Sequence, residues 1–101
     1  AVYYVTSTGG YPAVSAAFKV DPTKDNIQLE VYSGSIAANE WEYRLSQTSG
    51  TGTWTTGTTA LAVGTVNLEN KSATPGTWYC NLRHRASGHQ YFTTDQSVTV
   101  E

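Results

Sequence analysis

Three segments of this chain alternate between apolar and polar residues with a period of two, and this pattern is the strongest constraint on its fold. The segments are Ile27-Gln28-Leu29-Glu30-Val31, Trp41-Glu42-Tyr43-Arg44-Leu45 and Trp78-Tyr79-Cys80-Asn81-Leu82. Because successive side chains of a β-strand point to opposite faces, each segment presents one apolar and one polar face. Strands of this kind form antiparallel sheets that pack face to face. We therefore predict an all-β protein built as a two-sheet antiparallel β-sandwich.

The length and composition fit one domain of this class. The chain has 101 residues, of which 12% are aromatic, and this is about the size of a single sandwich. Only 14% of the residues are charged, the net charge is -2, and the six basic residues are scattered along the sequence. This balance predicts no binding to nucleic acid. Because no run of about 18 apolar residues occurs, we expect no membrane insertion.

The order of these segments resembles that of the immunoglobulin-like domain. In that family a strand with a cysteine precedes a core tryptophan, and a Gly-x-Tyr-x-Cys run leads into a later strand. Here Val31 stands at the position of the first cysteine, Trp41 stands at the core tryptophan, and the later strand begins with GTWYC at 76–80. The resemblance extends over residues 13–101 and implies an immunoglobulin-like Greek key.

The chain departs from the family pattern at two positions. Val31 replaces the first cysteine, so Cys80, the single cysteine of the chain, has no intramolecular disulfide partner. We expect Cys80 to be a small buried residue near Val31 and Trp41, with a reactive thiol or an intermolecular bridge as the alternative. Trp78 replaces the tyrosine whose hydroxyl bonds to the backbone, and its indole N–H could substitute. The resemblance implies the disulfide-free type that is common in bacteria and bacteriophages.

The other segments complete the expected sandwich. We expect strands at 13–20, 27–32, 41–46, 77–83 and 91–101, with a turn at 21–26 and loops at 33–40 and 84–90. Residues 47–59 are rich in Ser, Thr and Gly, which favours extended edge strands over helix.

Two further segments frame this sandwich. Leu61, Val63, Val66 and Leu68 suggest another strand whose inward face shifts around Gly64. Residues 1–12 are expected to form an N-terminal arm or an edge strand, and residues 13–101 the immunoglobulin-like domain.

The densest polar cluster follows the strand that contains Cys80. In the immunoglobulin-like arrangement the loop at 84–90 projects at one end of the sandwich beside the loop at 33–40. Arginine forks and tyrosine faces suit carboxylates, sugars or protein backbone, although an ordinary solvated hairpin would need no partner. The candidate binding residues are Arg83, Arg85, His89, Tyr91, Tyr79 and Trp54.

Trp54, which lies among Thr and Gly residues, is the best candidate for an exposed aromatic side chain. Carbohydrate-binding sandwiches stack sugar rings on such side chains, because an aromatic face attracts the C–H groups of the sugar. A tryptophan in the core or at a sheet edge is the alternative interpretation. Outward-facing tyrosines could also form a stripe with Asn81, which an intersubunit contact would explain as well as a glycan. These tyrosines are Tyr32, Tyr79 and Tyr91.

Catalytic and metal-binding chemistry finds little support in the sequence. His84 and His89 form only a partial metal set, because two histidines alone do not complete the ligands of a metal ion. Asp21 and Asp25 are better explained as turn residues than as a calcium loop. No nucleophile elbow and no pair of catalytic carboxylates is evident. We therefore expect no enzymatic activity, no cofactor and no bound metal.

Three hypotheses about function follow from these features. The first is a non-enzymatic immunoglobulin-like recognition or assembly module, at a virion surface (decoration, tail or fibre protein) or secreted and extracellular. Its partner would be a protein, including a capsid or tail protein or a second copy, or a cell-surface glycan. The second is a carbohydrate-binding module that uses Trp54 and the surface tyrosines. The third is a structural subunit in which Val2-Tyr3-Tyr4-Val5 adds a strand to a neighbour.

Overall fold

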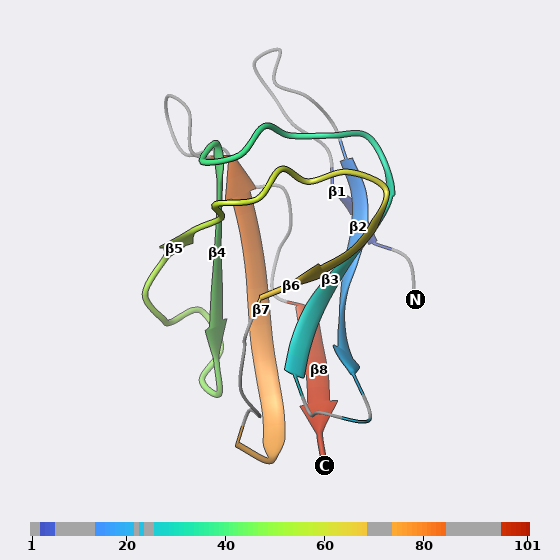
Figure 1. The fold of residues 1–101 in the computed structure, drawn as a ribbon. Coiled ribbons are helices and arrows are strands. Elements are labelled where there is room, and N and C mark those ends of the chain that lie inside the picture. Colours follow the sequence, from blue (N-terminus) through green and yellow to red (C-terminus); the bar gives the residue numbers. More distant parts are fainter. Residues whose placement is uncertain (1–2, 6–13, 22, 24–25, 69–73, 85–95) are drawn as a thin grey trace.

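A computed structural model describes residues 3–5, 14–21, 23, 26–68, 74–84 and 96–101 (Figure 1). Eight strands in these residues form two antiparallel sheets of four strands each. The first sheet has the order β1 (Tyr3–Val5), β2 (Val14–Asp21), β3 (Asn26–Ser33) and β6 (Gly64–Asn67). The second has the order β5 (Thr55–Thr56), β4 (Trp41–Ser46), β7 (Gly76–His84) and β8 (Gln96–Val100). The predicted all-β sandwich is therefore confirmed.

The strands lie close to the segments that alternation predicts. β4 spans the expected residues, and β2, β3 and β7 differ from the expected bounds by one residue at each end. The turn after β2 also forms, since the Asp21 carboxylate accepts hydrogen bonds from the backbone N–H of Thr23 at 2.9 Å and from its hydroxyl at 2.7 Å. Consecutive strands β3 and β4 lie in different sheets, as do β6 and β7. This order is compatible with an immunoglobulin-like domain.

The segments between the sheets differ from the expectation in two respects. Residues 47–59 form only the two-residue strand β5, because most of this segment follows a looped path. Val63 is 71% exposed, so it does not share the buried face of Leu61. The inward face does shift before β6, where Gly64 has a φ of 131° that an L-residue rarely adopts.

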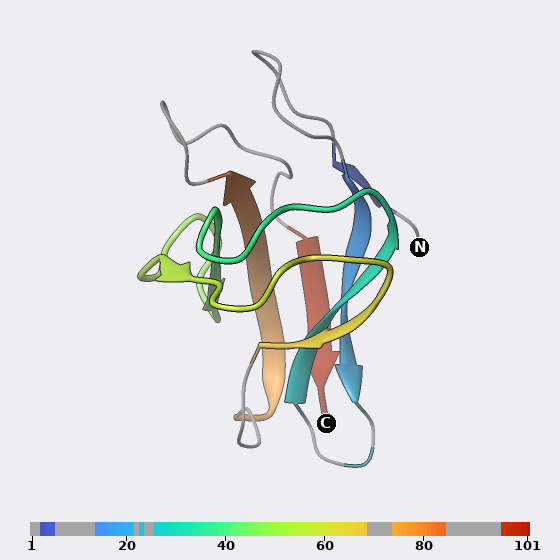
Figure 2. The same ribbon diagram turned by 45° about the horizontal axis from the view of Figure 1, so that its top comes forward.

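Two long connections run side by side over one end of the sandwich. The connection from β3 to β4 and that from β5 to β6 pair where Ile36 and Leu61 exchange backbone hydrogen bonds of 3.0 and 2.8 Å (Figure 2). Both of these side chains are buried, at 3% and 0% exposure. The pairing therefore closes this end of the core and fixes the path of the chain that follows β5.

The two sheets enclose the core that the sequence predicts. Cys80 is fully buried and Val31 and Trp41 are each 1% exposed, so the interpretation of Cys80 as a core residue is confirmed. Trp78 packs against this cluster, and its indole N–H donates to the carbonyl oxygen of Thr74 at 2.8 Å. The indole thus makes the bond to the upstream backbone that a tyrosine makes in the family that the sequence resembles.

A buried glutamine joins the sheets along one side of the sandwich. The side-chain amide of Gln96 accepts a hydrogen bond from the backbone N–H of Phe18 at 2.9 Å and donates to its carbonyl at 2.8 Å. One side chain therefore satisfies both backbone groups of Phe18, as a neighbouring strand would.

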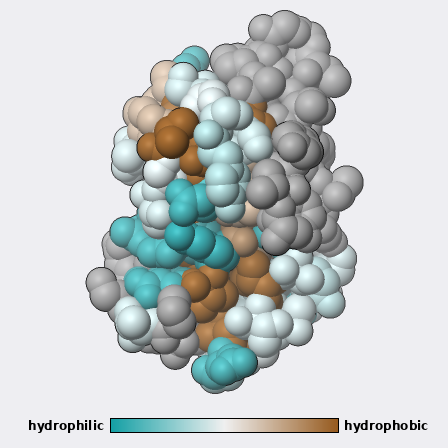
Figure 3. Space-filling model, turned by 90° about the vertical axis from the view of Figure 1, so that its right-hand side faces the viewer, coloured by the Kyte–Doolittle hydropathy of each residue, from teal (hydrophilic) through white to brown (hydrophobic). Residues whose placement is uncertain are grey.

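Figure 3 views the molecule from the side of β1 and β2, where a hydrophilic band crosses the middle between hydrophobic patches.

The N-terminal strand β1 pairs with β2 of the same chain, with Tyr3 opposite Ala16 and Val5 opposite Val14. It lies at the edge of the first sheet. The rest of the N-terminal segment lies outside the described residues, as do the hairpin after His84 and the beginning of the last predicted strand, residues 85–95.

Candidate functional site

The outer face of the second sheet holds two arginines in fixed positions. Strand register places Glu42 opposite Arg83 and Arg44 opposite Asn81. The Nε atom of Arg83 donates to Glu42 Oε1 at 2.8 Å, and Arg44 Nε donates to Asn81 Oδ1 at 2.9 Å. Each guanidinium group is therefore oriented by the side chain directly across the strand pair.

Trp54 packs against both of these arginines. The guanidinium carbon of Arg83 lies 3.8 Å from the centroid of the Trp54 ring, and that of Arg44 lies 4.6 Å from it. Trp54 reaches this position because it precedes β5, which pairs with β4 at the sheet edge. Arginine over an indole is a favourable cation–π arrangement. We refer to Glu42, Arg44, Trp54, Asn81 and Arg83 as the Trp54 cluster.

The Trp54 cluster is recessed although it belongs to an outer face. The side chains of Arg83 and Glu42 are only 15% and 11% exposed, and Asn81 is 3% exposed. Trp54 itself is half-buried. The Trp54 ring therefore lies against the sheet and covers part of both arginines.

The arginines of the cluster keep donor groups that the protein does not use. Within the described residues, Arg44 and Arg83 each donate a hydrogen bond only through Nε. The same residues contain no buried side-chain nitrogen or oxygen without a hydrogen-bond partner. The Nη groups of both arginines therefore reach solvent. The five side chains of the cluster include two guanidinium groups and one carboxylate, that of Glu42, so together they carry a net charge of +1.

The structure brings together two of the predicted binding residues. Arg83 and Trp54 were candidates for different reasons, and they meet in one cluster. Arg83 lies on β7, in the segment where a strand was expected, and its side chain pairs with Glu42. Tyr79 lies on the same strand, half-buried, opposite Ser46 and Ser97. The remaining candidates, Arg85, His89 and Tyr91, lie outside the described residues.

Sequence reasoning missed Glu42 and Arg44 as members of the cluster, and it assigned the third member, Asn81, to the tyrosine stripe. Their signal was present, because alternation places all three on the polar face of predicted strands. What the alternation leaves open is the register between β4 and β7, which decides which polar residues meet. The partners Glu42 and Arg83 are 41 positions apart in the sequence.

The predicted tyrosine stripe is wrong as a single surface. Tyr32, which is 47% exposed, lies on β3 in the first sheet, whereas Tyr79 lies on β7 in the second. Outer faces of the two layers of a sandwich point in opposite directions, so these side chains cannot share one contact surface. Asn81 is 3% exposed and accepts a hydrogen bond from Arg44, which removes it from such a stripe as well.

The histidine of the described strands lies in the protein interior. His84 is 4% exposed and stands opposite Trp41 in the ladder between β4 and β7. Its predicted partner in a metal pair, His89, lies outside the described residues. Among the residues that the structure describes, no three His, Cys, Asp or Glu side chains are grouped so that they could hold a metal ion.

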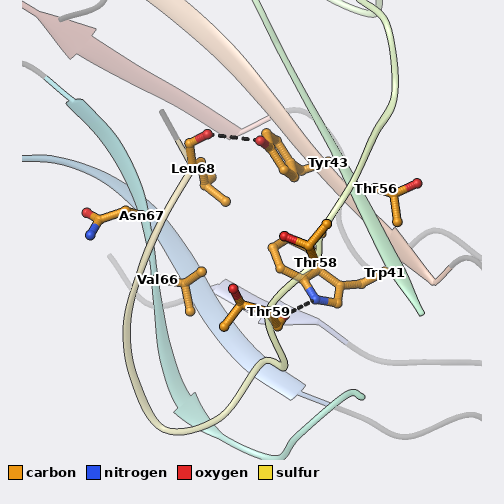
Figure 4. Close-up of a pocket in the computed structure, with 9 residues that line it drawn as sticks. Trp41, Tyr43, Thr56, Thr58, Thr59, Val66, Asn67 and Leu68 are labelled. Carbon is orange, nitrogen blue, oxygen red and sulfur yellow. Dashed lines mark hydrogen bonds between the residues drawn. The ribbon is translucent and has the colours of Figure 1, made fainter. Parts of the chain in front are cut away.

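A second concave feature lies between the sheets, on the side of β5 and β6. It is a hollow of about 260 Å³ lined by Trp41, Tyr43, Thr56, Gly57, Thr58, Thr59, Val66, Asn67 and Leu68 (Figure 4). The Trp41 indole N–H donates to the Thr59 carbonyl at 2.7 Å, and the Tyr43 hydroxyl donates to the Leu68 carbonyl at 2.9 Å. Because both aromatic donors hold the walls together and Trp41 is 1% exposed, the hollow offers little aromatic face to a ligand.

The Trp54 cluster is therefore the better candidate site, since it combines fixed arginines, an aromatic ring and donors that reach solvent. The described residues contain no helix of the length and apolarity needed to cross a membrane. No protein-family model, no curated protein sequence and no solved structure matches this chain.

Proposed function

We propose that this chain is a non-enzymatic immunoglobulin-like recognition module that attaches a virion or a secreted surface protein to its partner. The observation that carries the proposal is the stacking of Trp54 on Arg44 and Arg83. Tryptophan and arginine are the residue types most enriched among those that dominate binding energies. In this cluster their side chains are ordered before any partner binds, which reduces the entropic cost of association.

Three features support the immunoglobulin-like part of the proposal. The strand order β2-β3-β6 over β4-β7-β8 is compatible with that family. Trp41 occupies the core position on β4, and the Trp78 indole bonds to the backbone at Thr74. The third feature is the pair of residues at the two cysteine positions of that family, Val31 and Cys80. Both belong to the core cluster, and Cys80 is a free cysteine.

The non-enzymatic part of the proposal is supported by the burial of reactive residue types. Cys80 is fully buried and His84 is 4% exposed, so neither the Cys80 thiol nor the His84 imidazole is presented to a substrate. General bases and nucleophiles must come within hydrogen-bond reach of the substrate. The accessible polar groups of the Trp54 cluster are guanidinium donors, which suit recognition better than proton transfer at neutral pH.

The proposal can be tested by binding of the purified chain to a glycan array and to a panel of bacterial cells. We expect Trp54→Ala to reduce binding at least tenfold, because the variant removes the ring on which both arginines stack. The matched control is Tyr32→Ala, which removes an exposed aromatic side chain from the outer face of the opposite sheet. This control should bind within about twofold of the unchanged protein.

Two results would contradict the proposal. The first is undiminished binding by a folded Trp54→Ala variant, since the cluster would then not contact the partner. The second is the absence of binding by the unchanged chain on both the array and the cells. In that case the structural-subunit hypothesis is preferred, and removal of residues 1–10 should abolish assembly into particles while the sandwich remains folded.

A further inference from the structure

The Trp54 cluster has an excess of positive charge in a recessed place. Arg44 and Arg83 both lie within 4.6 Å of the centroid of one indole ring, and Glu42 is the carboxylate that pairs with Arg83. Like charges repel more strongly where protein excludes water, because the effective dielectric constant is lower than in bulk water. An anion that contacts both guanidinium groups would remove this repulsion. The net positive charge of the cluster therefore favours the binding of a negatively charged group.

The orientation of the two arginines points to a carboxylate. Both Nε atoms are occupied, by Glu42 and by Asn81, so the guanidinium planes are held while their Nη groups reach solvent. Planar N–H donors match the two oxygens of a carboxylate and form short, charge-assisted hydrogen bonds. A neutral hydroxyl group would leave the excess charge in place.

The surroundings of the cluster favour a sugar as the carrier of that carboxylate. Because the Arg83 side chain is only 15% exposed, a ligand that contacts its guanidinium group needs a small projecting group, and a carboxylate on a sugar ring is such a group. The half-buried indole of Trp54 provides apolar contact beside the charges. Exposed hydroxyl side chains at Thr53 and Thr55 flank Trp54 in the sequence, and hydroxyls can serve the polar edge of a sugar ring.

We propose that Arg44, Arg83 and Trp54 bind the carboxylate-bearing residue of an acidic glycan. This inference rests on the proposed function, and it specifies the ligand of the same site. The two arginines hold the carboxylate, Trp54 contacts the sugar ring, and Glu42 with Asn81 keeps the arginines in place.

The inference can be tested by NMR titration of the full chain with 3′-sialyllactose, with glucuronate and with neutral lactose. We expect saturable shifts of the Arg44 and Arg83 Nε–H signals and of the Trp54 indole signal for the two acidic sugars, and none for lactose. Trp41 and Trp78 serve as internal controls, because their indole N–H groups are bonded to Thr59 and Thr74. Their signals should remain unchanged.

Two variants test whether binding depends on the planar donors of the arginines or only on positive charge. Arg44→Lys keeps the charge but not the planar donors, and we expect it to weaken sialyllactose binding at least tenfold. Lys19→Gln removes one positive charge from the chain outside the Trp54 cluster, on a strand of the opposite sheet, and should leave the affinity within twofold. Thermal unfolding of each variant confirms that it is folded before its affinity is interpreted.

The outcomes also distinguish this inference from the proposed function. If acidic sugars cause no shifts while Trp54→Ala still abolishes binding to cells, the ligand assignment is wrong and the recognition site stands. Equal binding of lactose and sialyllactose would likewise overturn the role of the carboxylate. Binding of a tetraglutamate peptide in preference to both acidic sugars would show that the cluster recognises an acidic protein segment instead.

Discussion

The two sheets each have an ion pair between neighbouring strands, but the pairs lie in different environments. On the first sheet, Lys19 Nζ and Glu30 Oε1 are 2.9 Å apart, and their side chains are 41% and 25% exposed. On the second, Arg83 Nε and Glu42 Oε1 are 2.8 Å apart, and their side chains are 15% and 11% exposed. The contact distances are nearly equal, so the difference lies in how much water surrounds each pair.

Trp54 packs over Arg83 of the second pair, whereas among the described residues it is the Thr65 hydroxyl that bonds to both members of the first pair. Lys19 also donates to the Thr65 hydroxyl at 3.2 Å, and that hydroxyl donates to Glu30 at 3.2 Å. Exposed ion pairs contribute little because water and salt screen them. A pair that is largely desolvated leaves a costly charge behind when one partner is removed. The comparison therefore predicts unequal responses to equal substitutions.

The largest expected change in the free energy of unfolding comes from a substitution at Gly57, in the segment that positions Trp54. A Cβ atom at Gly57 would lie 2.0 Å from Cε2 of the Trp41 ring, which is buried and cannot move aside. We expect Gly57→Ala to lower the free energy of unfolding by about 3 kcal/mol, as severe overpacking does. Urea denaturation measures this loss.

The control for this substitution is Gly50→Ala. Gly50 has a φ of 74° and open space around its Cβ position, so only backbone strain opposes the change. We expect that strain to lower the free energy of unfolding by about 1 kcal/mol. Equal losses at both glycines would show that the contact between Gly57 and Trp41 does not hold the segment.

Removal of the carboxylate from the covered pair should have the next largest effect. Glu42→Gln leaves the partly buried Arg83 without its counter-charge, and we expect a loss of about 2 kcal/mol in the free energy of unfolding. Glu30→Gln is the matched substitution on the open pair and should cost less. The two variants are compared in the same urea titration at pH 7, and an equal loss would contradict the role assigned to burial.

Removal of the Trp54 side chain should make the two ion pairs more alike in their exposure to water. We expect Trp54→Ala to cost about 1 kcal/mol through the lost cation–π contacts. In a double-mutant cycle, Glu42→Gln should then cost less in the Trp54→Ala background than in the unchanged protein, because water reaches Arg83. Strictly additive losses would mean that Trp54 does not shield the pair.

The smallest expected effect is a shift in the titration of the open pair. The hydrogen bond from Lys19 lowers the pKa of the Glu30 carboxyl below its ordinary value of 4.5, with a smaller contribution from the charge of Lys19. The pair therefore stabilises the protein above pH 4.5, and this contribution is lost as the pH falls through the lowered pKa. Lys19→Gln should return the pKa toward 4.5. A ¹³C NMR titration of the Glu30 carboxyl measures the change, and an unchanged pKa would show that Lys19 does not hold it.

The parts of the fold that depend on local alternation could be predicted from the sequence. Trp41, Cys80 and Leu82 fall on apolar faces with a period of two, and all three are buried. The candidate site was less accessible to such reasoning. Arg83 was expected as the last residue of a strand, but alternation does not indicate that it lies opposite Glu42.

Trp54 shows most clearly where sequence reasoning ends. It lies in a segment of Ser, Thr and Gly without periodicity, so no pattern indicates the face to which its side chain turns. Its position follows from the short pairing of β5 with β4 and from the packing of Gly57 on Trp41. Both are contacts between segments distant in sequence, and only the folded chain determines them.

The burial of Cys80 has a practical consequence. As the single cysteine of the chain, with no exposed surface, it offers one thiol that reagents reach only when the sheets separate. The rate of its alkylation by a small maleimide under native conditions would therefore report the opening equilibrium of the whole sandwich. Cys80, which the sequence resemblance places at one half of a disulfide, thus reports unfolding without any engineered label.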